Sequence, residues 1–301
     1  MHLEFKLDNK QIRKGTAIGL PYIGSKKKIA KKIVALIIQN FGKNKTVYDV
    51  FGGGGAITFE CLLNDLDVVY NDLDPTPKTM LDTIINGDRE YLKTLLVSLD
   101  TFYRIKNKEI KRIDDQIRLL VNSFGYTCDG YLYGSKYADI KHNLSCLISE
   151  NHDCFTGYRH TDTFKKFKSS HTEHDLIKNI SRLQQLERLQ QLENIRTAKL
   201  HKKADYYNKD YRFFTDVKGA ILYLDPPYAG TTTQQYGGQI KDYQLFYDWC
   251  RQMGRRNVVL VSGYDMPVDF ECVYEFKKAS STLSLAEYRK PQRFEKLYMP
   301  R

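Results

Sequence analysis

Four consecutive glycines, residues 52–55, are the feature that most constrains how this 301-residue chain can fold. They stand in VYDVFGGGGAITFE (residues 47–60), between a short apolar run and a segment with a helical pattern. Glycine loses more backbone freedom on folding than any other residue, so four in a row are costly unless the backbone must be approached very closely. A glycine-rich loop that leaves a strand and opens a helix is typical of sites for nucleotide-like ligands.

The spacing within this loop does not match the dinucleotide fingerprint. Read from Gly52, the third glycine of G-x-G-x-x-G falls on Ile57, and read from Gly53 it falls on Thr58. The loop therefore predicts a nucleotide-like ligand other than NAD.

The chain on both sides of the loop alternates between helix and strand patterns. The predicted helices cover residues 26–39, 56–64 and 243–253. The predicted strands cover residues 47–50, 67–70, 220–224, 257–262 and 295–299. Strands that alternate with helices pair in parallel and carry helices on both faces, so the sequence predicts an α/β fold.

The amino-acid composition and the periodicity of the chain change between residues 86 and 174. This interval is rich in Tyr, Lys, Asn, Ser and His and has only weak periodicity. We expect it to be a separate module inserted into an α/β domain formed by residues 1–85 and 175–301.

A helix is predicted from Asp175, as its N-cap, through about Ile195. It contains the unit RLQQLE twice, at residues 182–187 and 188–193. Leucines at every third position drift around a helix, because three residues advance only about 300°. The pattern therefore predicts a helix that is covered on more than one side. A free coiled coil is the alternative, although a sustained 3.5-residue repeat is missing.

Net charge is the outlier of the composition. The chain has 47 Lys and Arg against 36 Asp and Glu, a net charge of +11 and a pI of about 9.1. This balance favours an anionic partner, nucleic acid before a membrane surface. Charge that serves solubility alone is the alternative.

We expect a cytoplasmic protein, either bacterial or phage-encoded in the host cytoplasm. No run approaches the ~18 apolar residues of a membrane span, and the N-terminal stretch lacks the apolar core of a signal peptide. The six cysteines include no C-x-x-C and are predicted to be reduced thiols. Cysteines and histidines gather between residues 128 and 174, but no spacing matches an established zinc pair, so we expect no metal.

The tetrapeptide DPPY, residues 225–228, directly follows the apolar run 220–224. A carboxylate there lies at the carboxyl edge of the sheet, where open α/β sheets bind ligands. Pro226 and Pro227 have no backbone N–H to donate, so the groups beside the ring of Tyr228 are mainly hydrogen-bond acceptors, a carboxylate and carbonyls. Acceptors beside a ring suit a planar substrate with an amino group. An ordinary Pro-Pro-Tyr turn is the alternative.

Asp72 follows the predicted strand 67–70 and lies 19 residues after Gly53. An acidic residue at about this distance from a glycine turn is placed to accept hydrogen bonds from ribose hydroxyls. The alternative is an Asp that ends a strand and forms a turn with Asp74 and Pro75.

Five lysines occupy the first turns of the helix that Ser25 is predicted to cap, namely Lys26, Lys27, Lys28, Lys31 and Lys32. Cations at this end oppose the helix dipole by about 0.3–1 kcal/mol each. The arrangement favours an anionic partner, either a carboxylate or phosphates, over a merely solvated face.

Taken in order, these stretches resemble the Dam-like family (D12 class, alpha type) of DNA adenine-N6 methyltransferases. PYIGSK (residues 21–26) is similar to the family's first cofactor motif, and DVFGGGGAITFE (49–60) to its glycine loop. YND (70–72) is similar to its ribose-binding acid and DPPY to its catalytic tetrapeptide. NSFGYTCDGYLYG (122–134) resembles the start of its DNA-reading insert.

The resemblance, which spans residues 21 to about 265, implies a Rossmann-like S-adenosylmethionine-dependent methyltransferase sheet with an inserted target-recognition domain over 86–174. It implies a catalytic group of Asp225, Pro226, Pro227 and Tyr228. The implied contacts of S-adenosylmethionine are Tyr22, Lys26, Phe51, Gly52, Gly53, Gly54, Asp72, Asp210, Tyr211 and Asp225. The expected contacts of double-stranded DNA are Lys27, Lys28, Asn122, Ser123 and Tyr126.

The function implied is methyl transfer from S-adenosylmethionine to the N6 amine of an adenine flipped out of duplex DNA, in a restriction-modification or phage setting. Two alternatives stay open. One is an enzyme of the same fold that methylates adenine in RNA or another planar amine. The other is a DNA-binding relative without activity. The oligomeric state, a monomer or a weak dimer on DNA, also stays open.

Overall fold

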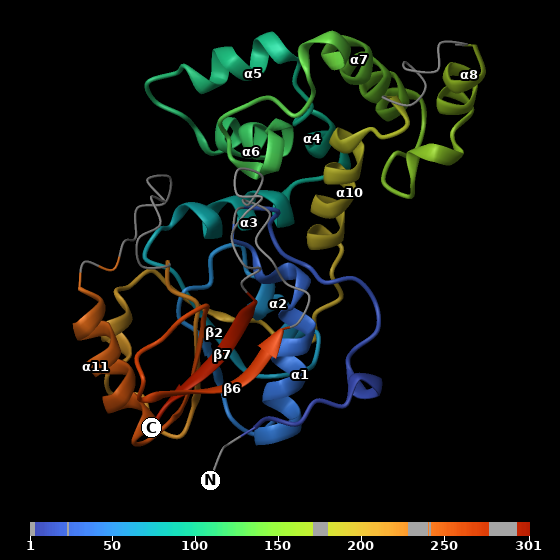
Figure 1. The fold of residues 1–301 in the computed structure, drawn as a ribbon. Coiled ribbons are helices and arrows are strands. Elements are labelled where there is room, and N and C mark those ends of the chain that lie inside the picture. Colours follow the sequence, from blue (N-terminus) through green and yellow to red (C-terminus); the bar gives the residue numbers. More distant parts are fainter. Residues whose placement is uncertain (1–3, 23, 171–179, 228–239, 241, 277–293) are drawn as a thin grey trace. The chain divides into compact units, whose positions relative to one another are not determined.

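The structure is a computed structural model that describes residues 4–22, 24–170, 180–227, 240, 242–276 and 294–301. The chain divides into two compact units (Figure 1). The first unit comprises Met1–Gly19, Gly24–Lys78 and Lys199–Arg301, and the second comprises Leu20–Ile23 and Thr79–Ala198.

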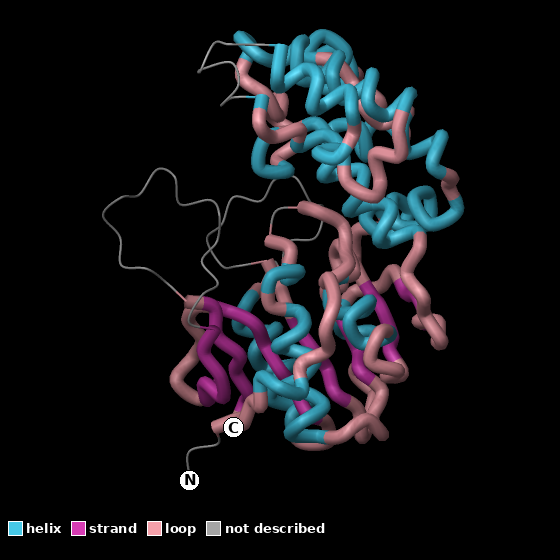
Figure 2. The backbone as a smooth tube through the Cα atoms, turned by 90° about the vertical axis from the view of Figure 1, so that its right-hand side faces the viewer, coloured by secondary structure: helices cyan, strands magenta, loops and turns pink. Residues whose placement is uncertain are grey.

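A seven-stranded sheet forms the centre of the first unit (Figure 2). Its strand order is β3-β2-β1-β4-β5-β7-β6. The strands are β1 (Val47–Asp49), β2 (Val68–Asn71), β3 (Asp205–Tyr207), β4 (Ile221–Leu224), β5 (Val258–Gly263), β6 (Phe270–Phe276) and β7 (Glu295–Pro300). The strands β3 to β5 of this order are parallel, whereas β7 pairs antiparallel with both β5 and β6.

Helices cover both faces of this sheet, as the alternation of strands and helices predicts. In β4, Ile221 and Tyr223 face one apolar cluster and Leu222 and Leu224 face the other. The first cluster includes α1 (Ala30–Phe41) and α2 (Ala56–Leu62), and the second includes α11 (Tyr243–Gly254). Because both clusters exclude water, β4 is apolar at every position. The predicted Rossmann-like α/β fold is confirmed.

The second unit is helical in the part that the structure describes. Its elements are α4 (Arg89–Lys93), α5 (Leu99–Lys106), α6 (Ile113–Asn122), η3 (Phe124–Tyr126), α7 (Ser135–Asn151), η4 (Tyr158–His160), α8 (Asp162–Ser170) and α10 (Gln184–Arg196). Helix α3 (Thr76–Asn86) crosses the boundary between the units. The weak periodicity noted for residues 86–174 therefore hides helices, of which α4, α5, α6 and α8 have ten residues or fewer and are too short to display a long apolar stripe.

Helix α10 carries the doubled RLQQLE sequence from Gln184 onward and belongs to the second unit. Its leucines Leu186, Leu189 and Leu192 are fully buried, and the polar Gln185 and Arg188 are buried as well. The helix packs against α4, α6 and α7, so the expected cover on several sides is confirmed. The second unit thus ends at Ala198, whereas the change in composition suggested that the inserted module ends at residue 174.

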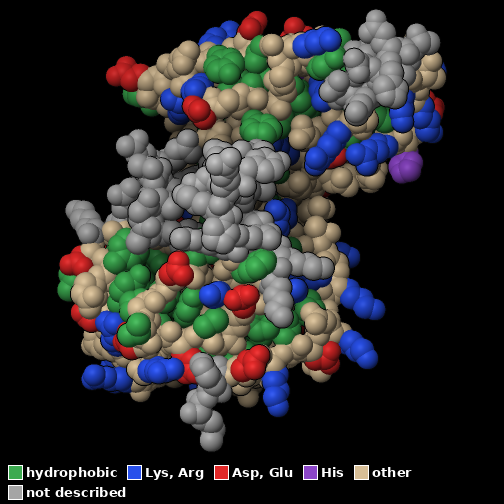
Figure 3. Space-filling model, in the orientation of Figure 1, with side chains coloured by type: hydrophobic (Ala, Val, Ile, Leu, Met, Phe, Trp, Pro, Cys, Tyr) green, Lys and Arg blue, Asp and Glu red, His purple; other side chains and the backbone are tan. Residues whose placement is uncertain are grey.

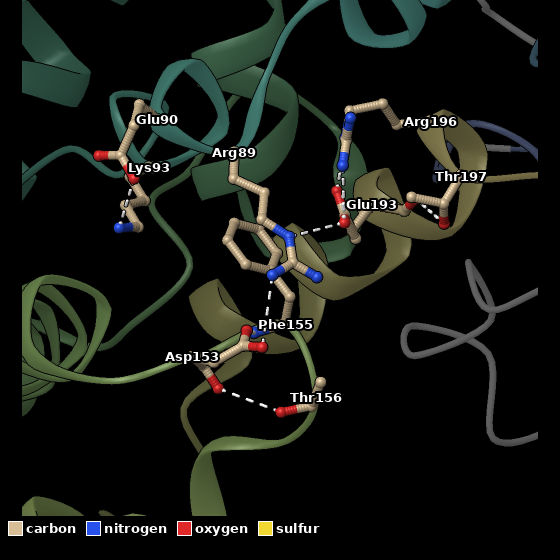
Figure 4. A network of polar contacts seen from close by, with 9 residues as sticks. All are labelled: Arg89, Glu90, Lys93, Asp153, Phe155, Thr156, Glu193, Arg196 and Thr197. Carbon is tan, nitrogen blue, oxygen red and sulfur yellow. Dashed lines mark hydrogen bonds and ion pairs between the residues drawn. The ribbon is translucent and has the colours of Figure 1, made fainter.

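An ion-pair network ties α4 to α10 in the second unit (Figure 4). Glu193 accepts from Arg89 Nε at 2.9 Å and from Arg196 Nε at 2.7 Å. Arg89 also lies 3.4 Å from Asp153 and over the ring of Phe155. Because the carboxylate of Glu193 is shared by two guanidinium groups, it holds α4, near the start of the second unit, against α10, near its end.

Several predicted boundaries were wrong. The helix expected over 26–39 is a short 3₁₀ turn, η2 (Lys26–Lys28), followed by α1. The long helix expected from Asp175 is interrupted before Gln184, where Leu183 has non-helical backbone angles (φ −100°, ψ 86°). Asp175 itself lies outside the described residues. Strands β3 and β6 were missed, because each is short or half-exposed and carries no continuous apolar run.

Candidate active site

The glycine loop connects β1 to α2 at the carboxyl edge of the sheet. Gly52 N–H donates to Asn71 O at 2.7 Å, and a Cβ at Gly52 would lie 2.3 Å from the Tyr70 ring. Gly53 has a φ of 46° and Gly55 a φ of 75°, values that glycine adopts at little cost. The close approach at Gly52 is therefore made by a side chain of the protein itself.

Asp72 joins this loop to the end of β2. Its Oδ2 accepts from Gly53 N–H at 2.8 Å, and its Oδ1 accepts from Asp74 N–H at 2.9 Å. Burial raises the pKa of this carboxyl, against the hydrogen bonds from the backbone, which lower it. The turn with Asp74 is thus present, and it holds the carboxylate beside the glycines.

Asp225 lies directly after β4 and forms an ion pair with Lys26. Its Oδ1 is 2.8 Å from Lys26 Nζ, and the same nitrogen is 3.0 Å from Glu295 Oε1 of β7. All three side chains are largely buried. Burial and, to a smaller extent, the charge of Glu295 raise the pKa of Asp225, Lys26 lowers it, and together they bring it to about 6. The 3₁₀ turn η2, capped by Ser25, places the ammonium here.

A third carboxylate, that of Asp49 at the end of β1, was missed by sequence reasoning. It is 1% exposed and accepts from Thr58 N–H at 3.1 Å and Thr58 Oγ1 at 2.7 Å. Burial raises its pKa to about 7, and the charges of Asp225 and Asp72 contribute. The available signal was an acidic residue in an apolar run just before the glycines.

These groups fit a ligand that brings positive charge and hydroxyls. Three carboxylates lie at the ends of β1, β2 and β4, where the charges of Asp225 and Asp72 both raise the pKa of Asp49, and Lys26 pairs with Asp225. A sulfonium, an ammonium and ribose hydroxyls would relieve this excess of acceptors. This set of carboxylates therefore suits S-adenosylmethionine better than a phosphate-rich nucleotide, whose negative charge the carboxylates would repel.

An aromatic cluster lies next to the loop. Phe51 is 6.3 Å from Tyr211 and 5.9 Å from Phe246 between ring centroids, and Tyr211 is 5.0 Å from Trp249. Phe51 and Tyr211 are only partly buried, so the sheet edge offers apolar faces for a flat ring. Asp210, beside them, caps η5 (Tyr211–Phe214) and pairs with Arg212 at 2.7 Å.

The DPPY turn is held from α11. Tyr243 donates its hydroxyl hydrogen to the carbonyl of Pro227, and Pro226 is buried. Tyr228 lies outside the described residues. Gly54 is buried in the loop, and Tyr22 lies in the Leu20–Ile23 segment of the second unit, so their roles stay predictions.

Two of the expected DNA contacts are corrected by the structure. Asn122 is 0% exposed, and its amide bonds Leu95 O, Arg118 O and Val97 N–H inside the second unit. Ser123 is also 0% exposed. These side chains build the core beneath the loop that follows them, because a buried amide must satisfy its donors and acceptors within the fold.

The loop after Ser123 presents its next residues outward. Phe124 is 57% exposed, and its N–H donates to Gly130 O at 2.7 Å, which closes a hairpin-like turn. Tyr126 is half-buried under Arg188, whose guanidinium lies 4.1 Å from the ring centroid. Tyr126 thus keeps a surface that a partner can reach.

The two lysines expected to contact DNA differ in their surroundings. Lys28 is exposed, whereas Lys27 is half-buried and burial lowers its pKa. Contacts of both with phosphate stay predictions.

Two other features are absent from the described part of the chain. No described helix is long and apolar enough to cross a bilayer. In the same part of the chain, His, Cys, Asp and Glu form no group of three or more that could hold a metal ion.

Comparison with known proteins adds to this geometry. No curated protein matches the chain. The model of the D12 class N6 adenine-specific DNA methyltransferase family matches residues 22–246, which include the glycine loop, Asp72, the second unit and the DPPY turn. Because the match covers most of the chain, this protein belongs to the D12 class of N6 adenine-specific DNA methyltransferases.

Proposed function

We propose that this enzyme takes the methyl group from S-adenosylmethionine and places it on the N6 nitrogen of an adenine flipped out of double-stranded DNA. The observation that carries the proposal is the largely buried Asp225, which pairs with Lys26 directly after β4 and is followed by two prolines. Family membership supplies the reaction, adenine-N6 methylation of DNA.

Asp225 and the carbonyl of Pro226 would accept the two hydrogens of the amine. The lone pair of this nitrogen is delocalised into the ring, so the amine must be drawn toward tetrahedral geometry before it can attack. In the described part of the chain, Asp225 makes its ion pair through Oδ1, which leaves Oδ2 to accept the amine hydrogen. Alignment then contributes more than a strong base would.

S-adenosylmethionine, when bound, supplies an electrophilic methyl group on its sulfonium. We assign its ribose to Asp72 and its adenine to the partly buried faces of Phe51 and Tyr211. The backbone of Gly52–Gly54 and the carboxylate of Asp49 would face its methionine end, where positive charge offsets the excess of acid. Lys26 and Tyr22 complete the predicted set.

Duplex DNA would be read by the second unit, residues 79–198, and held through phosphates by Lys and Arg. An amine paired in a duplex is out of reach, so the base must be extruded, and the ring of Tyr228 would stack on it. The outward position of Phe124 and Tyr126 supports the loop after Ser123 as a reading element. Lys27 and Lys28 would contact phosphates.

The proposal is tested by expressing the chain in a host that lacks DNA methylation and mapping N6-methyladenine in the host DNA. Methylation at one short sequence, absent with Asp225→Ala, is the expected result. Methylation without sequence preference would contradict the role of the second unit.

RNA is the alternative substrate, and a direct competition separates the two. Purified enzyme with radiolabelled cofactor is given equal amounts of duplex DNA and structured RNA. Label in DNA alone is expected, and label mainly in RNA would reject duplex DNA as the substrate.

A further inference from the structure

Lys26 is shared by two carboxylates from distant parts of the sequence. Its Nζ lies 2.8 Å from Asp225 Oδ1 and 3.0 Å from Glu295 Oε1. Glu295 is the first residue of β7, and like Lys26 it is buried. No motif in the sequence marks Glu295, since the fold alone brings it to the DPPY turn.

The carboxylate of Glu295 weakens the electrostatic effect of Lys26 on Asp225. An ammonium group has three N–H donors and one positive charge, so two carboxylates divide its attraction. The division matters here because charges interact more strongly in a buried site than in water. With both acids ionised, the three side chains carry a net charge of −1. Asp225 is then a stronger hydrogen-bond acceptor than it would be in a simple ion pair with Lys26.

We propose that Glu295 is a positioning residue for methyl transfer. By forming a second ion pair with Lys26, it weakens the interaction of Lys26 with Asp225, and Asp225 thereby stays a strong hydrogen-bond acceptor for the substrate amine. The inference rests on the proposed function, because it assigns Asp225 the role of accepting the amine hydrogen. A role in packing alone would need only a side chain of this size with an oxygen that accepts hydrogen bonds, and glutamine meets that need.

The other charged groups around Asp225 act in the same direction or more weakly. Among the described residues, Asp49 of β1 faces it as a further acid, and Tyr223 of β4 is neutral and bonded to Ser262 at 2.8 Å. Lys26 lowers the pKa of Asp225 and Glu295 raises it. Neutralising Glu295 therefore lowers that pKa and makes the carboxylate a weaker acceptor.

The experiment compares Glu295→Gln with wild type by single-turnover methyl transfer from about pH 5 to about pH 9, at saturating cofactor and duplex DNA. The plateau rate is expected to fall about threefold, as a weaker acceptor gives less assistance. The acid limb is expected to move to lower pH by about one unit, the usual effect of removing a nearby like charge. Apparent affinities for DNA and cofactor stay unchanged.

Two further variants make the comparison specific. Glu275→Gln is the matched control, because Glu275 lies on the neighbouring strand β6, is exposed and contacts Lys296 instead. Its pH profile should equal that of wild type. Glu295→Asp keeps the charge on a shorter side chain, so it should restore the position of the acid limb even where the rate is reduced.

A second measurement does not depend on activity. In protein labelled with ¹³C-carboxyl aspartate, the resonance of Asp225 is the one that Asp225→Asn removes, and its titration midpoint should lie near pH 6 in wild type. A lower midpoint in Glu295→Gln supports the inference, and an unchanged midpoint overturns it. If wild type transfers no methyl group to adenine, the proposed function fails, while the titration still decides on Glu295.

Discussion

At the scale of single residues, the site consists of buried charges that the fold holds close together. Lys26 is the cation that faces Asp225 and Glu295, and Asp49 is buried with only Thr58 as its hydrogen-bond donor among the described residues. Buried charges are costly unless they are paired, so each should leave a measurable trace in stability.

Replacing Lys26 with Met should destabilise the protein by about 3–5 kcal/mol, because two largely buried carboxylates then lose the ammonium that they share. The loss should be smaller at low pH, where those carboxylates gain protons. Urea unfolding at two pH values measures both effects, with exposed Lys28→Met as the control. Equal stability of the two variants would mean that Lys26 does not pair with the acids.

Asp49→Asn should stabilise the protein at pH 8 and have less effect at pH 5. The raised pKa, about 7, means that the folded state holds a proton that the unfolded state releases near pH 4. Wild-type stability is therefore lost as pH rises from about 4 to about 7, and a neutral amide avoids this loss. Thermal unfolding without cofactor measures it, and a variant that is less stable at pH 8 would show that the ionised form is favoured.

Gly52→Ala should destabilise the protein through Tyr70, since the added Cβ would lie 2.3 Å from its ring. A double-mutant cycle with Tyr70→Ala tests the cause, because residues in contact give non-additive effects. Additive losses would show that the clash with Tyr70 is not the reason for glycine there.

At the scale of elements, the doubled RLQQLE unit gives a matched pair of arginines. Arg182 is exposed, whereas Arg188 is buried and donates to three carbonyls of α6 and its end, those of Leu120, Val121 and Ser123. The helix thus holds the loop that begins at Phe124.

Arg188→Met should loosen that loop and weaken the choice of DNA sequence, with little effect on cofactor binding. Without the guanidinium, three buried carbonyls lose a donor, each at about 1–3 kcal/mol. Hydrogen exchange should become faster in residues 123–131, and Arg182→Met should leave it unchanged. Equal exchange in both variants would remove Arg188 from the support of the loop.

The sequence predicted some elements well because their physics is local. Strand β4 is apolar at every position, and α2 begins right after the glycines, so both were placed within about two residues. Glu295 could not be found, because one acid at the start of a strand becomes part of the site only through tertiary pairing. Asn122 and Ser123 were assigned to DNA from a motif, which carries no information about burial.

At the scale of the whole molecule, positive charge is spread widely. Figure 3 shows Lys and Arg side chains over both units, with Asp and Glu among them in this view. A net charge of +11 on such a surface suits a long polyanion contacted at many points.

DNA affinity should fall steeply with salt, because each phosphate contact releases counterions. With about 6–10 contacts, the loss between about 50 and 200 mM salt is about 10³–10⁵-fold. Fluorescence anisotropy with a labelled duplex measures it. A flat dependence would mean that the charge serves solubility instead.

The central claim is that Asp225 reshapes the amine of a flipped adenine. The measurement is single-turnover methyl transfer by wild type and Asp225→Ala at saturating cofactor, with 2-aminopurine fluorescence at the target base in parallel. The account predicts that Asp225→Ala still binds and flips the base, while transfer falls by at least about a hundredfold. Methyl transfer by Asp225→Ala at a rate near wild type would contradict the account, because DPPY would then be only a turn.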